Sequence, residues 1–124
     1  MDAVSLHCPK NKETINMFSE NEFEIMKESA FLINCARGGI INEEALLDAL
    51  KSNKIRAAGL DVYDDEPSTS SNPLFSLDNI LVSPHIAGVT QEATIRMSKQ
   101  AVQNVLDVFD DKVDPEVIIN KNVL

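Results

Sequence analysis

Four short apolar runs alternate with polar or amphipathic segments along this chain. They lie at residues 3–7, 30–33, 55–61 and 80–82. Runs that are apolar almost throughout are typical of strands buried in a parallel sheet. Helices in two of the connections between the runs strengthen this interpretation. The pattern therefore predicts four parallel strands in a sheet that is covered on both faces.

Helix signals separate and follow these runs. Ser19 and Glu22 form a capping-box pattern, and Asn42 precedes an acidic first turn and an apolar helical face at residues 43–50. After Thr90, apolar residues recur at helical spacing through residues 92–108. With right-handed crossovers, these elements predict an α/β fold: half of a doubly wound, Rossmann-like parallel sheet, followed by a long C-terminal helix and a tail.

The composition narrows the classes of partner. Twenty acidic and eleven basic residues give a formal net charge of −9, which argues against nucleic acid or an anionic membrane as a partner. No apolar run approaches the roughly 20 residues of a membrane span, and the N-terminus lacks the features of a signal peptide. Cys8 and Cys35 form neither a disulfide framework nor a metal-site spacing. We expect a cytoplasmic protein with reduced thiols and no metal site.

Candidate chemistry follows three of the apolar runs. Arg37 comes after the second run, Glu66 after the third and His85 after the fourth. Open α/β folds bind their ligands at the carboxyl edge of the sheet, where these residues would meet. Histidine can also give or take a proton near neutral pH. Three such residues at three strand ends predict a functional site.

The motifs around these residues resemble those of the D-isomer-specific 2-hydroxyacid dehydrogenases. The resemblance covers nearly the whole chain in order, through His7-Cys8-Pro9 with Thr14, Asn34-Cys35-Ala36-Arg37-Gly38-Gly39, Gly59-Leu60-Asp61-Val62, Glu66-Pro67 and Pro84-His85-Ile86-Ala87-Gly88. Within the family, the Cys-Ala-Arg-Gly-Gly run looks most like D-3-phosphoglycerate dehydrogenases. Glyoxylate and hydroxypyruvate reductases are close.

The resemblance implies hydride transfer between NAD and a 2-hydroxy or 2-oxo acid such as 3-phosphoglycerate. Arg37 would bind the substrate carboxylate and carbonyl, because its planar fork can donate two hydrogen bonds to a carboxylate. His85 would act as the general acid/base. Glu66 would pair with His85 and favour its protonated form.

The resemblance also implies a cofactor site at the same strand ends. Asp61 would accept a hydrogen bond from the nicotinamide carboxamide, although a strand-end Asp that caps a turn remains an alternative. Glycine would allow the close approach that backbone contacts with a cofactor need. The remaining cofactor contacts would be Cys8, Pro9, Thr14, Cys35, Ala36, Arg37, His85, Ala87 and Gly88.

The resemblance covers only part of the family's domain organisation. Residues 1–112 would form the second half of an NAD-binding domain, and residues 113–124 a tail that returns to a substrate domain. No Gly-x-Gly-x-x-Gly motif occurs. We therefore expect a truncated chain that is inactive alone and forms a homodimer or higher oligomer that covers either its open sheet edge or the long helix after Thr90. The alternative is a non-catalytic fragment that acts as an oligomerising or partner-binding module.

Overall fold

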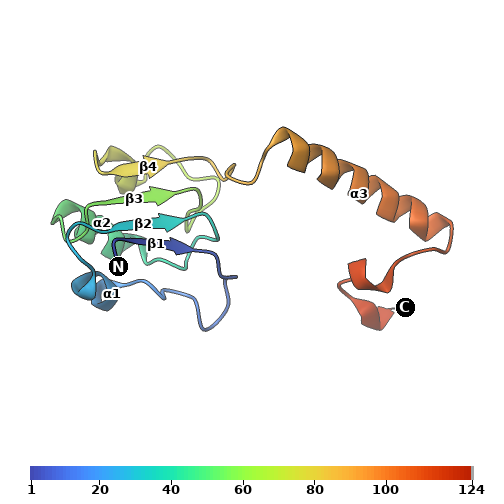
Figure 1. The fold of residues 1–124 in the computed structure, drawn as a ribbon, viewed down its shortest axis with the longest axis horizontal. Helices are drawn as coiled ribbons and strands as arrows, with labels where there is room; N and C mark the ends of the chain where they lie inside the picture. The colour runs from blue at the N-terminus through green and yellow to red at the C-terminus, as the bar shows by residue number, and fades with distance from the viewer. Residues whose placement is uncertain (124) are drawn as a thin grey trace. The chain divides into compact units, whose positions relative to one another are not determined.

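Four parallel strands form one sheet in the computed structural model, which describes residues 1–123 (Figure 1). The strands lie in chain order, as β1 (Ala3–Leu6), β2 (Phe31–Asn34), β3 (Ala57–Leu60) and β4 (Ile80–Val82). Their register brings Leu6, Asn34 and Leu60 level, and Leu60 lies opposite Val82. The loops that follow all four strands therefore leave the sheet at one edge. The predicted parallel sheet is confirmed.

Residues 1–123 contain three α-helices, and side-chain caps begin two of them. Asn42 accepts a hydrogen bond from the Ala45 N–H at 2.9 Å, and Thr90 accepts one from the Ala93 N–H at 3.1 Å. Before the remaining helix, the Ser19 N–H donates to Glu22 at 2.9 Å. The predicted helix starts are thus confirmed. The helices are α1 (Glu20–Ile25), α2 (Glu43–Lys51) and α3 (Gln91–Phe109), with short 3₁₀ turns at η1 (Pro73–Ser76), η2 (Pro115–Val117) and η3 (Lys121–Val123).

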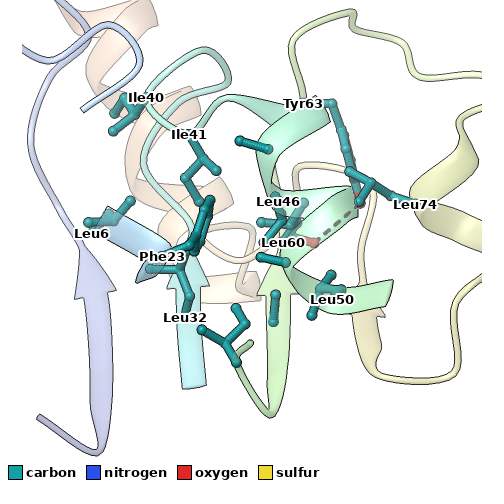
Figure 2. Packing of buried hydrophobic residues seen from close by; sticks show 14 residues of the cluster. Leu6, Phe23, Leu32, Ile40, Ile41, Leu46, Leu50, Leu60, Tyr63 and Leu74 are labelled. Atoms are coloured by element: carbon teal, nitrogen blue, oxygen red, sulfur yellow. Dashed lines mark hydrogen bonds between the residues drawn. The ribbon is translucent and has the colours of Figure 1, made fainter. Parts of the chain in front are cut away.

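The hydrophobic core lies between one face of the sheet and the helices α1 and α2. Figure 2 shows Phe23 of α1 beside Leu32 of β2, and Leu46 of α2 near Leu60 of β3. Leu32 and Leu46 are completely buried. Every second strand residue thus points toward the helices, as the period of a strand requires. This packing holds the sheet edge, and the loops that leave it, in place.

The expectation that both sheet faces are covered is wrong within residues 1–87. Phe31, Ile33 and Leu81 on the opposite face are 42%, 38% and 77% exposed. The strands follow one another in sequence order, and crossovers between parallel strands are right-handed in nearly all proteins. Successive helices therefore fall on the same face of the sheet, and the other face remains open in this part of the chain.

The chain forms two compact units, Met1–Ala87 and Gly88–Leu124. The first unit contains the sheet, α1 and α2, and the second contains α3 with η2 and η3. Among the described residues of α3, none is buried. None of the helices in residues 1–123 is both long and apolar enough to cross a lipid bilayer.

Candidate active site

Glu66 and His85 meet at the carboxyl edge of the sheet. The Oε2 atom of Glu66 lies 2.7 Å from Nδ1 of His85, and Oε1 accepts a hydrogen bond from the Tyr63 N–H at 2.9 Å. The His85 side chain is 46% exposed, and its Nε2 atom has no hydrogen-bond partner among residues 1–123. The ring is therefore oriented through one nitrogen while the other is open to a ligand.

The charge at this edge favours a carboxylate at Glu66. The pKa of Glu66 is held below its ordinary value, first by the hydrogen bond from His85 and then by the Tyr63 N–H. The charges of His85 and Arg37 lower this pKa further. Arg37, Glu66 and His85 follow the carboxyl ends of three parallel strands, and Gly38 packs against the Tyr63 backbone, so all three predicted catalytic residues belong to loops at the same end of the sheet. At neutral pH, Glu66 accepts the Nδ1 proton of His85.

Asp61 holds the loop that carries His85. Asp61 is 3% exposed, and its carboxylate oxygens accept hydrogen bonds from the Ser83 hydroxyl at 2.6 Å and the N–H groups of Ile86 and Ala87 at 2.8 and 2.9 Å. Burial raises the pKa of Asp61, but these hydrogen bonds outweigh burial and lower it overall. These contacts are the ones expected of a strand-end Asp that caps a turn, which was the alternative interpretation of Asp61. A contact between Asp61 and nicotinamide stays a prediction.

His85 itself has a left-handed backbone, with φ at +57°. A non-glycine residue rarely adopts this conformation without support from its surroundings. The hydrogen bonds from residues 86 and 87 to Asp61 supply such support directly after His85. The loop at residues 83–87 is therefore built to present an imidazole ring at a defined place.

The Arg37 loop depends on a buried amide. Asn34, which is 2% exposed, accepts from the Ala36 N–H at 3.0 Å and donates to the Arg37 carbonyl at 2.9 Å. Gly38 then packs directly against the loop after β3, since a Cβ atom there would lie 1.7 Å from the Tyr63 carbonyl oxygen. The Arg37 side chain is exposed and donates only to the neighbouring Ala36 carbonyl, at 2.7 Å, among the described residues.

A pocket of about 700 Å³ lies where β1 and β2 end. Thr14 is not part of the lining but contacts it, because its hydroxyl donates to the carbonyl of the lining residue Pro9 at 2.7 Å. Ala87 lies next to Asp61, to which its N–H donates, and Gly88 is the first residue of the second unit. The structure thus gathers five of the predicted cofactor residues around one pocket, whose lining consists of His7, Cys8, Pro9, Lys10, Cys35, Ala36 and Arg37.

Sequence reasoning missed three residues that organise this edge: Asn34, Tyr63 and Ser83. Asn34 carried a usable signal, because it continues the alternation of buried positions from Leu32 and is polar. Such a residue at a strand end suggests a side chain that bonds to the following loop. Tyr63 and Ser83 carried no local signal, because they contact each other across 20 residues of sequence.

The fold and the site define an α/β protein with a carboxylate–imidazole pair and an arginine at the ligand-binding edge of a parallel sheet. Comparison with known families then shows that the chain belongs to the D-isomer specific 2-hydroxyacid dehydrogenases, since residues 1–87 match the NAD binding domain of that family. The family membership predicted from the sequence motifs is confirmed.

Individual relatives support the same family. The chain is 42% identical over 123 residues to a glyoxylate reductase of Thermofilum pendens. This match covers 99% of this chain and 36% of that protein. It is 41% identical over 107 residues to a D-3-phosphoglycerate dehydrogenase of Archaeoglobus fulgidus, covering 86% of this chain and 20% of that protein. The chain thus spans about a third or less of the relatives it matches.

A solved structure has the same fold. The D-isomer specific 2-hydroxyacid dehydrogenase of Lactobacillus delbrueckii ssp. bulgaricus, in its NAD complexed form, matches with a TM-score of 0.81 and 32% identity. The match covers 96% of this chain and 40% of that one. The predicted Rossmann-like architecture is confirmed by this likeness.

Proposed function

We propose that this chain provides the acid/base and carboxylate-binding side of an NAD-dependent dehydrogenase that interconverts 2-hydroxy and 2-oxo acids such as 3-phosphoglycerate. The observation that carries the proposal is the 2.7 Å contact between Glu66 and His85, at the end of the sheet where the Arg37 loop also lies. The family match and the names of the two relatives support the same class of reaction.

The three side chains have complementary roles in this reaction. When bound, the nicotinamide supplies or receives the hydride. During reduction, His85 donates its Nε2 proton to the carbonyl oxygen of the 2-oxo acid, and during oxidation the neutral ring takes that proton back. Glu66 accepts the Nδ1 proton throughout and thereby orients the ring, which leaves Nε2 open to the substrate. Arg37 binds the substrate carboxylate with two hydrogen bonds.

The pocket at the ends of β1 and β2 fits the nicotinamide end of the cofactor. It is open, and its lining includes Arg37 together with Cys8, Pro9, Cys35 and Ala36. Asp61 can also contribute, because a carboxylate offers about four acceptor sites and the structure uses three of them. One acceptor site therefore remains for the nicotinamide carboxamide.

A graft tests the proposal. The chain aligns with 123 residues of the Thermofilum pendens glyoxylate reductase, so it can replace the corresponding segment of that enzyme. Oxidation of NADH is then followed with glyoxylate and hydroxypyruvate, and reduction of NAD with 3-phosphoglycerate. We expect turnover with at least one of them. His85→Asn should reduce kcat by a factor of about 10²–10⁴.

Arg37→Lys provides the second arm of this test. A lysine keeps the charge but loses the bidentate geometry, so KM for the acid should rise. Arg56→Lys is the matched control, because Arg56 precedes β3 at the opposite sheet edge and packs over the Phe31 ring. A graft that binds NAD and keeps full turnover after His85→Asn would overturn the proposal.

The 124 residues tested by themselves should show little turnover. Hydride transfer needs both halves of the cofactor held in place and water excluded, and this chain corresponds to 36% of the matched glyoxylate reductase. Robust oxidation of a 2-hydroxy acid by the purified chain would contradict this expectation.

Assembly and compartment complete the proposal. We infer a homodimer, supported by the exposed apolar side chains Phe31, Ile33 and Leu81 on the open sheet face. We place the protein in the cytoplasm, supported by the unbridged cysteines Cys8 and Cys35. Light scattering at micromolar concentration tests the first inference, and a monomer across the concentration range would refute it.

A further inference from the structure

We propose that Tyr63 is a positioning residue for proton transfer: it holds Glu66 with its backbone N–H and the His85 loop with its hydroxyl. The proposal rests on the role of His85 as general acid/base put forward above. It assigns a function to a side chain that does not itself contact His85 by any described hydrogen bond.

The contacts of Tyr63 reach both partners of the Glu66–His85 pair. Its N–H donates to Oε1 of Glu66 at 2.9 Å, while Oε2 of the same carboxylate contacts His85. Its hydroxyl lies 2.9 Å from the Ser83 carbonyl oxygen, two residues before His85. The relative position of Glu66 and His85 is thus set through one residue.

Two backbone carbonyl oxygens lie within hydrogen-bond distance of the Tyr63 hydroxyl. It also lies 3.2 Å from the Leu60 carbonyl oxygen, the contact drawn in Figure 2. A phenol has one proton to donate, so it makes its stronger hydrogen bond to only one of these oxygens. The shorter contact, with the Ser83 carbonyl, is therefore the one that the hydroxyl proton satisfies.

The Tyr63 ring and backbone are themselves held firmly. The residue is only 6% exposed, and its ring packs edge-on against Phe75 with centroids 5.2 Å apart. On the other side, Gly38 lies so close that a Cβ atom would be 1.7 Å from the Tyr63 carbonyl oxygen. Tyr63 consequently touches the loops of all three predicted catalytic residues. Because burial raises the pKa of its phenol, the hydroxyl remains a donor through the neutral range.

The His85 loop needs such support. His85 has a φ of +57°, a conformation that reverts easily unless contacts on both sides hold it. Asp61 holds the backbone after His85, at Ile86 and Ala87. On the side before His85, the Tyr63 hydroxyl holds the Ser83 carbonyl. Loss of that hydroxyl should therefore loosen His85 relative to Glu66.

The tautomer of neutral His85 reports this effect directly. When Nδ1 donates to Glu66, the Nδ1–H tautomer dominates, and when the contact loosens, the Nε2–H tautomer gains. Long-range ¹H–¹⁵N NMR of the labelled full chain distinguishes the two. The chain has only two histidines, so a His7→Gln variant assigns the signals.

Tyr63→Phe removes only the hydroxyl. We expect the ratio of Nδ1–H to Nε2–H tautomer at His85 to fall roughly fivefold, the factor typical of one net hydrogen bond. Phe75→Leu is the matched control, since it perturbs the same aromatic contact and removes no hydrogen bond. A tautomer ratio unchanged by Tyr63→Phe, or changed equally by Phe75→Leu, would overturn the proposal.

A second variant covers the case in which Tyr63→Phe does not fold. Tyr63 is the chain's single tyrosine, so biosynthetic replacement by 3-fluorotyrosine alters this residue alone. Fluorine makes the phenol a stronger donor, and the tautomer ratio should move in the opposite direction. No movement would count against a positioning role.

The graft adds a catalytic readout. There, Tyr63→Phe should lower kcat roughly fivefold and leave KM for the 2-oxo acid unchanged. A change in KM alone would contradict the proposal. If the graft has no activity while the tautomer shifts in the chain, the dehydrogenase function fails and the positioning of His85 by Tyr63 stands.

Discussion

Replacement of Gly38 by alanine should destabilise the fold sharply through a single added methyl group. The new Cβ would lie 1.7 Å from the Tyr63 carbonyl oxygen and 2.2 Å from its carbon, whereas real Cβ atoms are essentially never found within 3.0 Å of another atom. The two loops would have to separate by about 1.3 Å. Because both contacting groups are backbone, no side chain can move aside to relieve the clash.

The cost follows from this geometry. Overpacking of a core typically costs about 1–3 kcal/mol and occasionally more. With backbone on both sides, we expect a loss of about 3 kcal/mol or more in the free energy of unfolding. That loss is a large share of the roughly 5–15 kcal/mol that stabilises a typical domain.

Urea unfolding followed by circular dichroism measures the effect, with the free energy taken from the midpoint and slope. Gly59→Ala is the matched control, because its Cβ would meet only Ile33, at 3.9 Å. Gly59 lies inside β3, where alanine is favoured over glycine by roughly 0.5–1 kcal/mol, so this variant should be neutral or slightly stabilised. If Gly38→Ala loses less than about 1 kcal/mol, the Arg37 loop does not pack against Tyr63 as described.

Three further predictions concern single side chains. The fold lowers the pKa of Asp61 below 3.8, so its ionised form stabilises the fold above that pH, and this stability is lost as the pH falls through the lowered pKa. Asp61→Asn should flatten this acid-induced loss in urea titrations at stepped pH, and an unchanged profile would contradict the assignment. The fold raises the pKa of Tyr63 above 10.0, so the neutral phenol stabilises the fold below that pH, and this stability is lost as the pH rises through the raised pKa. The absorbance of the single tyrosine should titrate above pH 10.0, and a midpoint at 10.0 in folded protein would argue against a buried phenol. Leu46→Ala at a fully buried site should lower the free energy of unfolding by about 2–5 kcal/mol, whereas Leu81→Ala, at a site 77% exposed, should change it by no more than about 0.5 kcal/mol. Similar losses for both variants would mean that the open sheet face is buried in solution.

Local patterns in the sequence were enough to locate the elements. The apolar runs became β1 to β4, and Asn42 and Thr90 cap the helices whose starts they predicted. Both signals act over a few residues, because strand burial has a period of two and a cap bonds two or three residues ahead. Arg37, Glu66 and His85 could be selected for the same reason, since each closely follows an apolar run.

The open sheet face could not be read from the same patterns. Phe31 and Ile33 are as apolar as the buried strand residues Leu32 and Leu60. Which face a residue occupies follows from strand phase, but which face the helices cover follows from strand order and crossover hand. Neither property is encoded in a local stretch of sequence.

The support beneath the site was likewise decided only by the tertiary structure. Sequence motifs indicated Asp61 as a cofactor ligand, whereas the fold shows its carboxylate binding residues 83, 86 and 87. Tyr63 was not indicated at all, and its hydroxyl finds the Ser83 carbonyl 20 positions away. The sequence by itself determined which residues stand at the strand ends. The pairing of β3 with β4 decided which of these residues form hydrogen bonds with one another. The register of the two strands places their ends side by side, and only this brings groups so distant in the chain within hydrogen-bond reach.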